Sequence, residues 1–292
     1  MRWLVLAAVT VRLWAAGPPS ADEIVRRAAE NQRRAQEARK AYVYDMDVFV
    51  RLKRANGKVA REESRQYVVV PGPKGASRKM VELSGKVVDG KKIIPYTEAR
   101  FEHGKPDIDG ALTDSVGKEI LWRKSGFGQF VQWYPGPNSD DAGRFRYKFD
   151  GEERFREYDV YKISFSQKRK DSGQCWSGEV LVEKTEFQPV MVSSHWDCKI
   201  PLAVQALLGT NVSQIGSKVT YQRFDKDVWF PVSCGGEMKL RVLFLYARTI
   251  AFTAANKGFR KADVQTTVEF ETQDGDKSEN GVWPTSRPSS LP

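Results

Sequence analysis

The 292-residue chain is poor in the residues that most often do chemistry, with only two histidines and three cysteines. Neither a C-x-x-C nor an H-E-x-x-H pattern occurs, and the sequence lacks a nucleophile elbow, a phosphate loop and a dinucleotide fingerprint. Of the histidines, His195 falls on the polar side of an alternating run, which is typical of a surface residue. We therefore expect no catalytic residue, no metal site and no cofactor.

Paired carboxylates are also scarce. The adjacent pairs Asp140-Asp141 and Glu152-Glu153 fall in turn-like segments, where successive side chains diverge, so that general acid and base roles are a poor fit. The sequence predicts a protein that is not an enzyme, and a hydrolase with an unfamiliar site is the alternative that remains.

Long apolar runs are missing as well, because no uncharged stretch approaches the roughly 20 residues of a membrane-spanning helix. The chain begins with Met1 and Arg2, continues through an apolar stretch interrupted by Arg12, and reaches Gly17-Pro18-Pro19. This pattern predicts a signal peptide over residues 1–17, with cleavage after Gly17. Cleavage would leave the protein in the periplasm or secreted, and a retained membrane anchor is the alternative.

Charge of both signs is abundant, with 47 basic and 37 acidic residues and a net charge of +10. No basic helix, finger or stacking motif occurs, so we expect no nucleic-acid partner, and the excess favours anionic lipid over acidic partners. Without a linker in the middle of the chain, one domain over residues 18–272 is expected. Residues 273–292 are rich in Asp, Gly, Ser and Pro, which predicts a disordered tail.

The first elements are predicted from a capping pattern and a turn signal. Ser20 and Glu23 form a capping box for a helix that runs to about Arg39, with Glu23/Arg27 and Glu30/Arg34 at salt-bridging spacing. An alternating run from Tyr42 then reaches Asn56-Gly57, a strong hairpin signal. A two-residue turn there makes facing residue numbers sum to 113. The facing pairs are then Tyr44 with Val69, Met46 with Tyr67, and Arg51 with Glu62.

A second hairpin is predicted over residues 175–198. With facing numbers that sum to 372 or 374, one side is apolar and consists of Trp176, Val180, Val182, Val190, Val192 and Trp196. The other side consists of Ser177, Glu179, Glu183, Ser193, His195 and Asp197, with Leu181 and Met191 as exceptions. An antiparallel sheet that is apolar on one side only must cover something.

The three cysteines of an exported chain permit one disulfide. The open end of this hairpin makes Cys175 and Cys198 the candidate pair, with Cys234 buried and free. Their numbers sum to 373 rather than an even value, so the bond needs a bulge near that end.

Between the two hairpins we expect a short helix around Val116–Lys124 and a polar turn at Gly151-Glu152-Glu153 that joins strands 144–150 and 158–167. A short helix or crossing is predicted over Pro201–Leu208. Further along, separate strands are expected over 229–233 and from Met238, and a final strand over 264–270.

Three segments resemble the bacterial periplasmic lipoprotein-carrier superfamily, of the outer-membrane lipoprotein-sorting type. They are Ala21–Arg39 with its D-E-I-V start, Trp176–Val192, and the closing strands with Trp229-Phe230-Pro231 and Tyr246 to Arg260. The resemblance implies a strongly curved, incomplete antiparallel barrel whose apolar concave side is closed by helices. Members carry lipoproteins or sense envelope damage.

The expected fold is mainly β (α+β), a single curved antiparallel sheet or incomplete β-barrel. It has an N-terminal amphipathic helix and one or two short helices on its concave side. The expected function is an exported, non-enzymatic binding protein, monomeric, that holds lipid or lipoprotein acyl chains. A structural or sensory protein with an envelope protein partner is the alternative. The predicted ligand-binding residues are Tyr44, Met46, Val48, Tyr67, Trp176, Val180, Val182, Val192 and Trp196.

Overall fold

The computed structural model describes residues 19–71, 76–98, 107–122, 145–168, 176–196, 211–225, 228–242 and 246–262. The predicted signal peptide, Cys175, Cys198, the 201–208 segment, the 264–270 strand and the tail lie outside these residues. In chain order the elements are α1 (Ala21–Arg39), β1 (Tyr42–Arg54), β2 (Val59–Val70), β3 (Ser77–Asp89), β4 (Lys92–Tyr96), α2 (Ile108–Trp122), β5 (Phe145–Phe155), β6 (Tyr158–Gln167), β7 (Trp176–Glu183), β8 (Pro189–Trp196), β9 (Asn211–Asp225), β10 (Val228–Val242) and β11 (Tyr246–Lys261).

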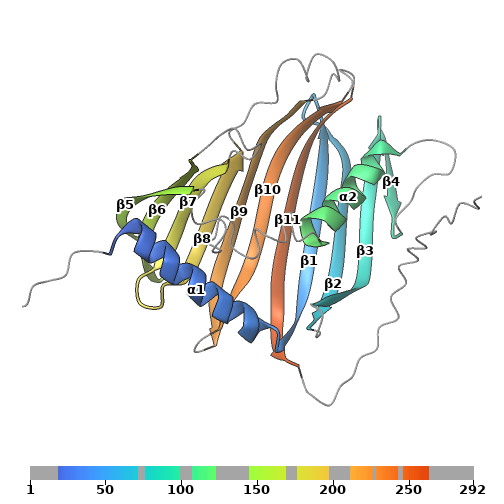
Figure 1. Ribbon diagram of the computed structural model, residues 1–292. Helices are drawn as coiled ribbons and strands as arrows, with labels where there is room; N and C mark the ends of the chain where they lie inside the picture. The colour runs from blue at the N-terminus through green and yellow to red at the C-terminus, as the bar shows by residue number, and fades with distance from the viewer. Residues whose placement is uncertain are drawn as a thin grey trace, which may run out of the picture. The chain divides into compact units, whose positions relative to one another are not determined.

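All eleven described strands belong to one antiparallel sheet, with the order β4-β3-β2-β1-β11-β10-β9-β8-β7-β6-β5 (Figure 1). The first and the last described strands lie side by side within the sheet, where β1 pairs with β11. Strands β4 and β5 form the two edges, so the sheet is open. This confirms the predicted class, a mainly β fold built on one antiparallel sheet.

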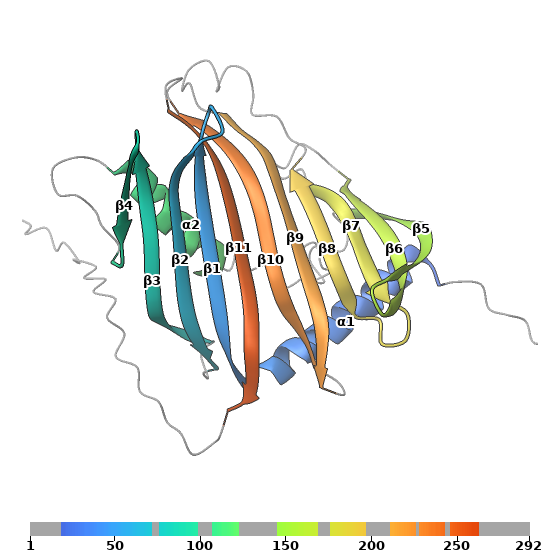
Figure 2. The ribbon, with the colours of Figure 1, turned by 180° about the vertical axis from the view of Figure 1, so that it is seen from behind.

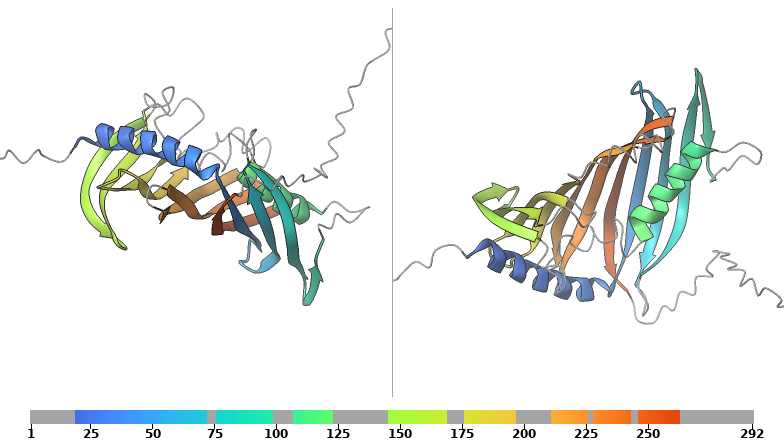
Figure 3. Two further views of the ribbon diagram at one scale, coloured as in Figure 1. Left: turned by 90° about the horizontal axis from the view of Figure 1, so that it is seen from below. Right: turned by 45° about the horizontal axis from the view of Figure 1, so that its top comes forward.

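Both helices lie on the same face of the sheet. Figure 2, seen from behind, shows the strands in front of α1 and α2, and the curvature of the sheet can be followed in Figure 3. Helix α1 contacts β5 and β10, whereas α2 contacts β1 and β2. Neither helix combines the length and the apolar composition that a membrane crossing requires, among the residues described.

One row of facing residues crosses the whole sheet and defines its helix-covered face, which we call the inner face. From β5 to β4 the row consists of Tyr147, Phe165, Gly178, Ser194, Ser217, Gly236, Phe252, Val50, Glu63, Gly85 and Tyr96. Aromatic rings lean over the glycines beside them. A Cβ on Gly178 would lie 2.8 Å from the Phe165 ring, and one on Gly236 would lie 2.7 Å from the Phe252 ring. The rings therefore fill the space that the glycines leave.

Helix α1 begins as the sequence predicts. The Ser20 hydroxyl accepts from the Glu23 backbone N–H at 3.2 Å. The Glu23 carboxylate binds Arg26 and Arg27 rather than the free backbone N–H of the capping box. The predicted Glu23/Arg27 pair forms, but Glu30 pairs with Arg26 and not with Arg34. Both arginines lie four residues from Glu30, so the spacing allows either pair, and the Arg34 guanidinium donates to Asn31 instead.

The predicted strand registers of both hairpins are confirmed, but the two-residue turn at Asn56-Gly57 is wrong. The β1/β2 register shifts between Leu52 and Lys53, so that Lys53 faces Val59 and the Arg54 N–H donates to the Lys58 oxygen, which leaves residues 55–57 in the turn. Tyr44 faces Val69, Met46 faces Tyr67 and Arg51 faces Glu62. In the second hairpin, facing numbers sum to 372 from the Trp176/Trp196 pair to the Leu181/Met191 pair. A bulge beyond Leu181 then shifts the register, so that Val182 faces Pro189.

Three predictions of element bounds are wrong. Helix α2 begins at Ile108 rather than near Val116, because the Asp107 carboxylate caps it by accepting from the Gly110 N–H at 2.7 Å. Strand β5 continues through residues 151–155, since Gly151, at φ 133°, sits at a register shift rather than in a turn. The turn lies at 156–157, where Arg156 adopts φ 56°.

The third wrong bound concerns strand β10. It is one strand of 15 residues rather than two, since its register shifts opposite β9 absorb the irregular residues around Ser233. The last described strand is β11, which lies beside β1 in the centre of the sheet rather than at an edge.

Candidate functional site: the inner face and the helix that covers it

The nine predicted ligand-binding residues all lie on the inner face, in two groups. The first group is Tyr44, Met46, Val48 and Tyr67 on β1 and β2, and the second is Trp176, Val180, Val182, Val192 and Trp196 on β7 and β8. Within the second group the rings of Trp176 and Trp196 meet edge to face, with centroids 5.2 Å apart. Strands β11, β10 and β9 lie between the two groups, and their buried side chains join both groups into one continuous apolar core.

Burial divides these residues differently. Six of them are core residues with at most 6% of their surface exposed, namely Met46, Val48, Tyr67, Val180, Val182 and Val192. The other three, Tyr44, Trp176 and Trp196, are half-buried. The half-buried tryptophans thus keep apolar surface that the described residues do not cover.

The tryptophans belong to a wider group of half-buried aromatic side chains on the β5–β8 part of the inner face. We call this group the aromatic patch, and it consists of Tyr147, Phe149, Tyr161, Trp176 and Trp196. The Phe149 and Tyr161 rings lie 6.1 Å apart. Sequence analysis identified the two tryptophans but not the three residues on β5 and β6, although their alternation with Arg146, Lys148 and Lys162 was available as a signal.

At the other end of the inner face the side chains are charged. Arg61, Glu63 and Arg65 follow one another along β2, and each side chain is at most 8% exposed. Arg65 Nε lies 2.5 Å from Glu63 Oε1. The Tyr96 hydroxyl donates to Glu63 Oε2 and accepts from Arg61 Nε, both at 2.7 Å. Every carboxylate and guanidinium here therefore has a partner, as burial of charge requires.

Helix α2 is attached to the sheet through three aspartates, two of which bind the arginines of this charged region. Asp107 lies 2.6 Å from Arg61. Asp114 lies 3.3 Å from Arg65. Asp109, in the first turn of the helix, binds Arg248 of β11 at 2.7 Å. Polar contacts therefore accompany the small apolar contribution that Leu112 and Val116 make to the core.

Gly110 permits this close approach of helix and sheet. A Cβ at that position would lie 2.8 Å from Arg61 Nη1 and 2.3 Å from Asp107 Oδ2. Any larger residue would push the helix away from the guanidinium that its cap residue binds.

The electrostatics of the cluster follow from burial and from these partners. Burial together with the hydrogen bond to Glu63 raises the pKa of Tyr96, and burial together with Asp109 raises the pKa of Tyr246. Burial alone would lower the pKa of Arg65, but Glu63 and Tyr67 raise it above its usual range. The tyrosines stay protonated as donors and the arginine stays charged at neutral pH.

The sequence did contain a signal for this cluster. The register that sums to 113 puts Arg61, Glu63 and Arg65 on the face of Tyr67 and Val69, which was expected to be apolar. Charged side chains that point into a buried face need charged or polar partners, which other elements must supply. Nothing local, however, indicates that the partners are aspartates of α2.

Other predicted features have these outcomes. Cys234 is buried with a free thiol, and burial raises its pKa, while the Cys175–Cys198 bond lies outside the described residues. His195 is exposed opposite Ser177, whose hydroxyl lies 2.8 Å from His195 Nε2. In the part of the chain that the structure describes, no group of His, Cys, Asp and Glu is placed to hold a metal ion.

No family model matches the chain. No curated protein matches it in sequence. Among solved structures, it is similar to a DUF1329 family protein from Desulfovibrio piger, at 11% identity and a TM-score of 0.36, over 85% of this chain and 96% of that one. It is similar to a putative outer membrane lipoprotein-sorting protein domain from Vibrio parahaemolyticus, at 12% identity and a TM-score of 0.34, over 84% and 95%. A third similarity is to lipovitellin, in a structure that describes its lipid–protein interactions, at 8% identity and a TM-score of 0.34, over 78% of this chain and 26% of that one. Similarity at this level describes the fold alone.

Proposed function

We propose that this protein is an exported, non-enzymatic binding protein that holds an acyl chain, free or on a lipidated partner, against its inner face. The observation that carries the proposal is the aromatic patch. Its five aromatic residues remain half-buried on the face that the helices cover. Apolar surface left open on that face is what an acyl chain would bury.

The attachment of α2 supports the same function. A helix held by carboxylate–guanidinium pairs keeps its position without a large apolar interface. When the helix moves away, water can hydrogen-bond to the separated carboxylates and guanidinium groups. Helix α1, in contrast, buries Ile24, Val25 and Ala28 completely against the core. In this proposal α2 is the displaceable cover of the inner face and α1 is the fixed one.

Quenching of tryptophan fluorescence tests the proposal. A fatty acid brominated along its chain quenches an indole only on contact, so binding to the aromatic patch should quench Trp176 and Trp196. The double variant Trp176→Phe and Trp196→Phe keeps the apolar surface and should remove most of the quenching. Trp229→Phe is the matched control, because Trp229 is 1% exposed and donates to Glu186 from within the core. Equal quenching in both variants, or none in the wild type, would contradict the proposal.

A structural or sensory role with a protein partner is the second candidate, and one observation favours it. Near the β4 edge, Met80, Val81 and Ile93 expose 48%, 54% and 62% of their surface. Exposed apolar side chains beside an open edge fit an interface better than a bare surface. A partner bound there would be lost in Val81→Lys and Ile93→Lys, whereas uptake of acyl chains would be unchanged.

A further inference from the structure

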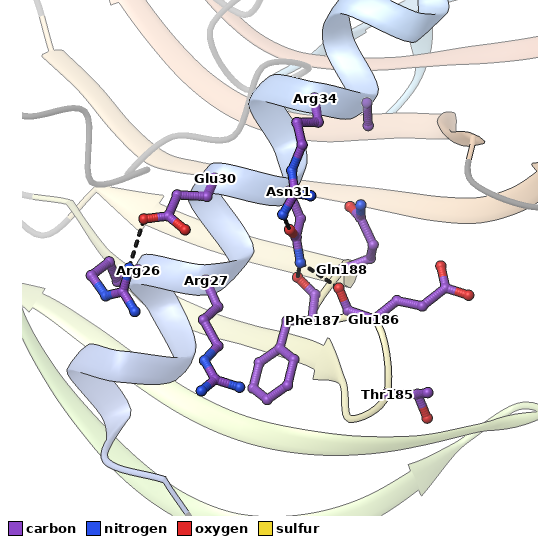
Figure 4. Close-up of a pocket in the computed structure, with 10 residues that line it drawn as sticks. Arg26, Arg27, Glu30, Asn31, Arg34, Thr185, Glu186, Phe187 and Gln188 are labelled. Carbon is purple, nitrogen blue, oxygen red and sulfur yellow. Dashed lines mark hydrogen bonds and ion pairs between the residues drawn. The ribbon is translucent and has the colours of Figure 1, made fainter.

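A cavity of about 630 Å³ lies outside the inner face, between α1 and the turn that joins β7 to β8. The helix contributes Arg26, Arg27, Glu30, Asn31, Arg34 and Ala35, and the turn contributes Thr185, Glu186, Phe187 and Gln188 (Figure 4). None of the nine predicted ligand-binding residues lines it. Its chemistry is therefore independent of the proposed acyl-chain function.

The carboxylates that line the cavity are already bound. Glu30 accepts from Arg26 at 2.6 Å. Glu186 accepts from the Trp229 indole N–H at 2.6 Å and lies 3.0 Å from Arg223. Both carboxylates therefore pair with arginines other than Arg34.

Arg34 differs from the other arginines of the cavity. Arg26 and Arg27 each bind Glu23. Arg34 has no ion pair among the described residues, and its guanidinium donates to the neutral Oδ1 of Asn31. An exposed guanidinium that is oriented by an amide and forms no ion pair can bind an anion without breaking an existing ion pair.

The walls of the cavity are fixed by polar contacts between the helix and the turn. The Asn31 amide donates to the backbone oxygens of Glu186 and of Phe187, the latter at 3.3 Å. The buried Gln32 donates to Gln188 at 2.7 Å. The Arg27 guanidinium lies 4.7 Å from the centre of the Phe187 ring. Figure 4 shows these two side chains next to each other. Since Asn31 holds both the turn and Arg34, the guanidinium is oriented before a ligand arrives.

We propose that this cavity is a binding site for a phosphate group, with Arg34 as the principal ligand and Arg27 as the second cation. A phosphate accepts the paired N–H donors of a guanidinium, and its charge is offset by the cation that no carboxylate here neutralises. The phosphate could belong to a lipid headgroup or to a small soluble phosphate. Both sources share the same chemistry at Arg34.

Titration of the full chain with inorganic phosphate tests the site, with the Nε–H signal of Arg34 and the amide signal of Asn31 as readouts in NMR spectra. We expect saturable shifts of both signals. In Arg34→Gln the affinity should fall about tenfold, as expected for the loss of a charged hydrogen bond. Arg33→Gln is the matched control, because it removes the same charge from the neighbouring residue, which does not line the cavity, and its affinity should change less than about twofold.

Vesicles of phosphatidylglycerol in phosphatidylcholine then distinguish the two sources. Co-sedimentation that depends on Arg34 and not on Arg33 assigns the site to a lipid headgroup. Saturable phosphate binding without such co-sedimentation assigns it to a soluble phosphate. Absence of saturable shifts, or equal weakening in the Arg34 and Arg33 variants, would overturn the proposal, because the attraction would then be a property of the basic surface as a whole.

Discussion

Arg248 of β11 binds both carboxylate oxygens of Asp109 in α2, with Nε 2.7 Å from Oδ1 and Nη2 3.0 Å from Oδ2. The Tyr246 hydroxyl donates to the same carboxylate. The side chains of Arg248 and Asp109 are 16% and 19% exposed, so the pair is largely out of water. This two-pronged contact ties the first turn of α2 to a central strand of the sheet.

Replacement of Asp109 should therefore loosen α2 specifically. Asp109→Asn leaves Arg248 without its carboxylate, and we expect a loss of about 2 kcal/mol of folding free energy. Hydrogen exchange measured by mass spectrometry should become faster in residues 108–122 and remain unchanged in α1. Glu37→Gln is the control, because its exposed pair with Lys40 should contribute less than about 0.5 kcal/mol. Unchanged protection of α2 would contradict this role.

Neighbouring glutamates on β2 should differ sharply in their contribution to stability. Glu63→Gln leaves Arg61 and Arg65 short of a carboxylate inside the sheet, which should cost about 3 kcal/mol in urea unfolding. Glu62 lies on the other face between Arg51 at 2.5 Å and Lys86 at 2.7 Å, and Glu62→Gln should cost at most about 1 kcal/mol. Equal costs would mean that the charged region of the inner face is solvated.

Acid should weaken the start of α1. Hydrogen bonds from Arg26 and Arg27 lower the pKa of Glu23 from 4.5 to about 2. Because the folded pKa lies below the unfolded one, the stabilisation is complete above pH 4.5 and is lost as the pH falls towards 2. An NMR titration of the Glu23 carboxyl should give the lowered value, and Glu23→Gln should flatten the pH dependence of unfolding in this window. Titration of Glu23 near 4.5 would contradict the ion pairs.

The disulfide between Cys175 and Cys198 remains a prediction. The nearest described pair, Trp176 with Trp196, sums to 372, so the bond requires one extra residue between Trp196 and Cys198. A bond between these cysteines would close a loop of about 24 residues, and it should stabilise the folded protein by roughly 3 kcal/mol. Peptide mapping without reduction should recover the two segments linked, and reduction should lower the melting temperature. Alkylation of both thiols in the untreated protein would show that the even register continues.

Local patterns explain what the sequence predicted well. Alternation of side chains matches the registers of β1 with β2 and of β7 with β8, and Asn56-Gly57 marks the place of the first turn, although a bulge at Leu52/Lys53 gives that turn one residue more than expected. In each of these two hairpins, the facing residues are at most about 25 positions apart in the sequence. The inner-face positions of the nine ligand-binding residues follow from these registers, because side chains alternate strictly along a strand.

The remaining features depend on contacts between distant segments, which no local pattern encodes. The pairing of β1 with β11 joins residues about 200 apart, and nothing in either strand specifies the other. The start of α2 was missed because Gly110 weakens a helix signal locally, whereas its role is to allow contact with Arg61. The sequence predicts a Glu30/Arg34 pair, but Glu30 pairs with Arg26. Both arginines lie four residues from Glu30, so spacing alone does not determine which of them the carboxylate binds.

Native mass spectrometry of the full-length protein, purified gently from its host envelope, tests the central claim most directly. If the inner face holds an acyl chain, the protein should carry an added mass that denaturation releases as an acyl-bearing amphiphile. Protein stripped of that mass should regain one when it is incubated with a fatty acid, and Asp109→Asn should exchange it faster than the wild type does. A protein that carries no such mass and takes none up would contradict the account, because its aromatic patch would then be only a packed surface.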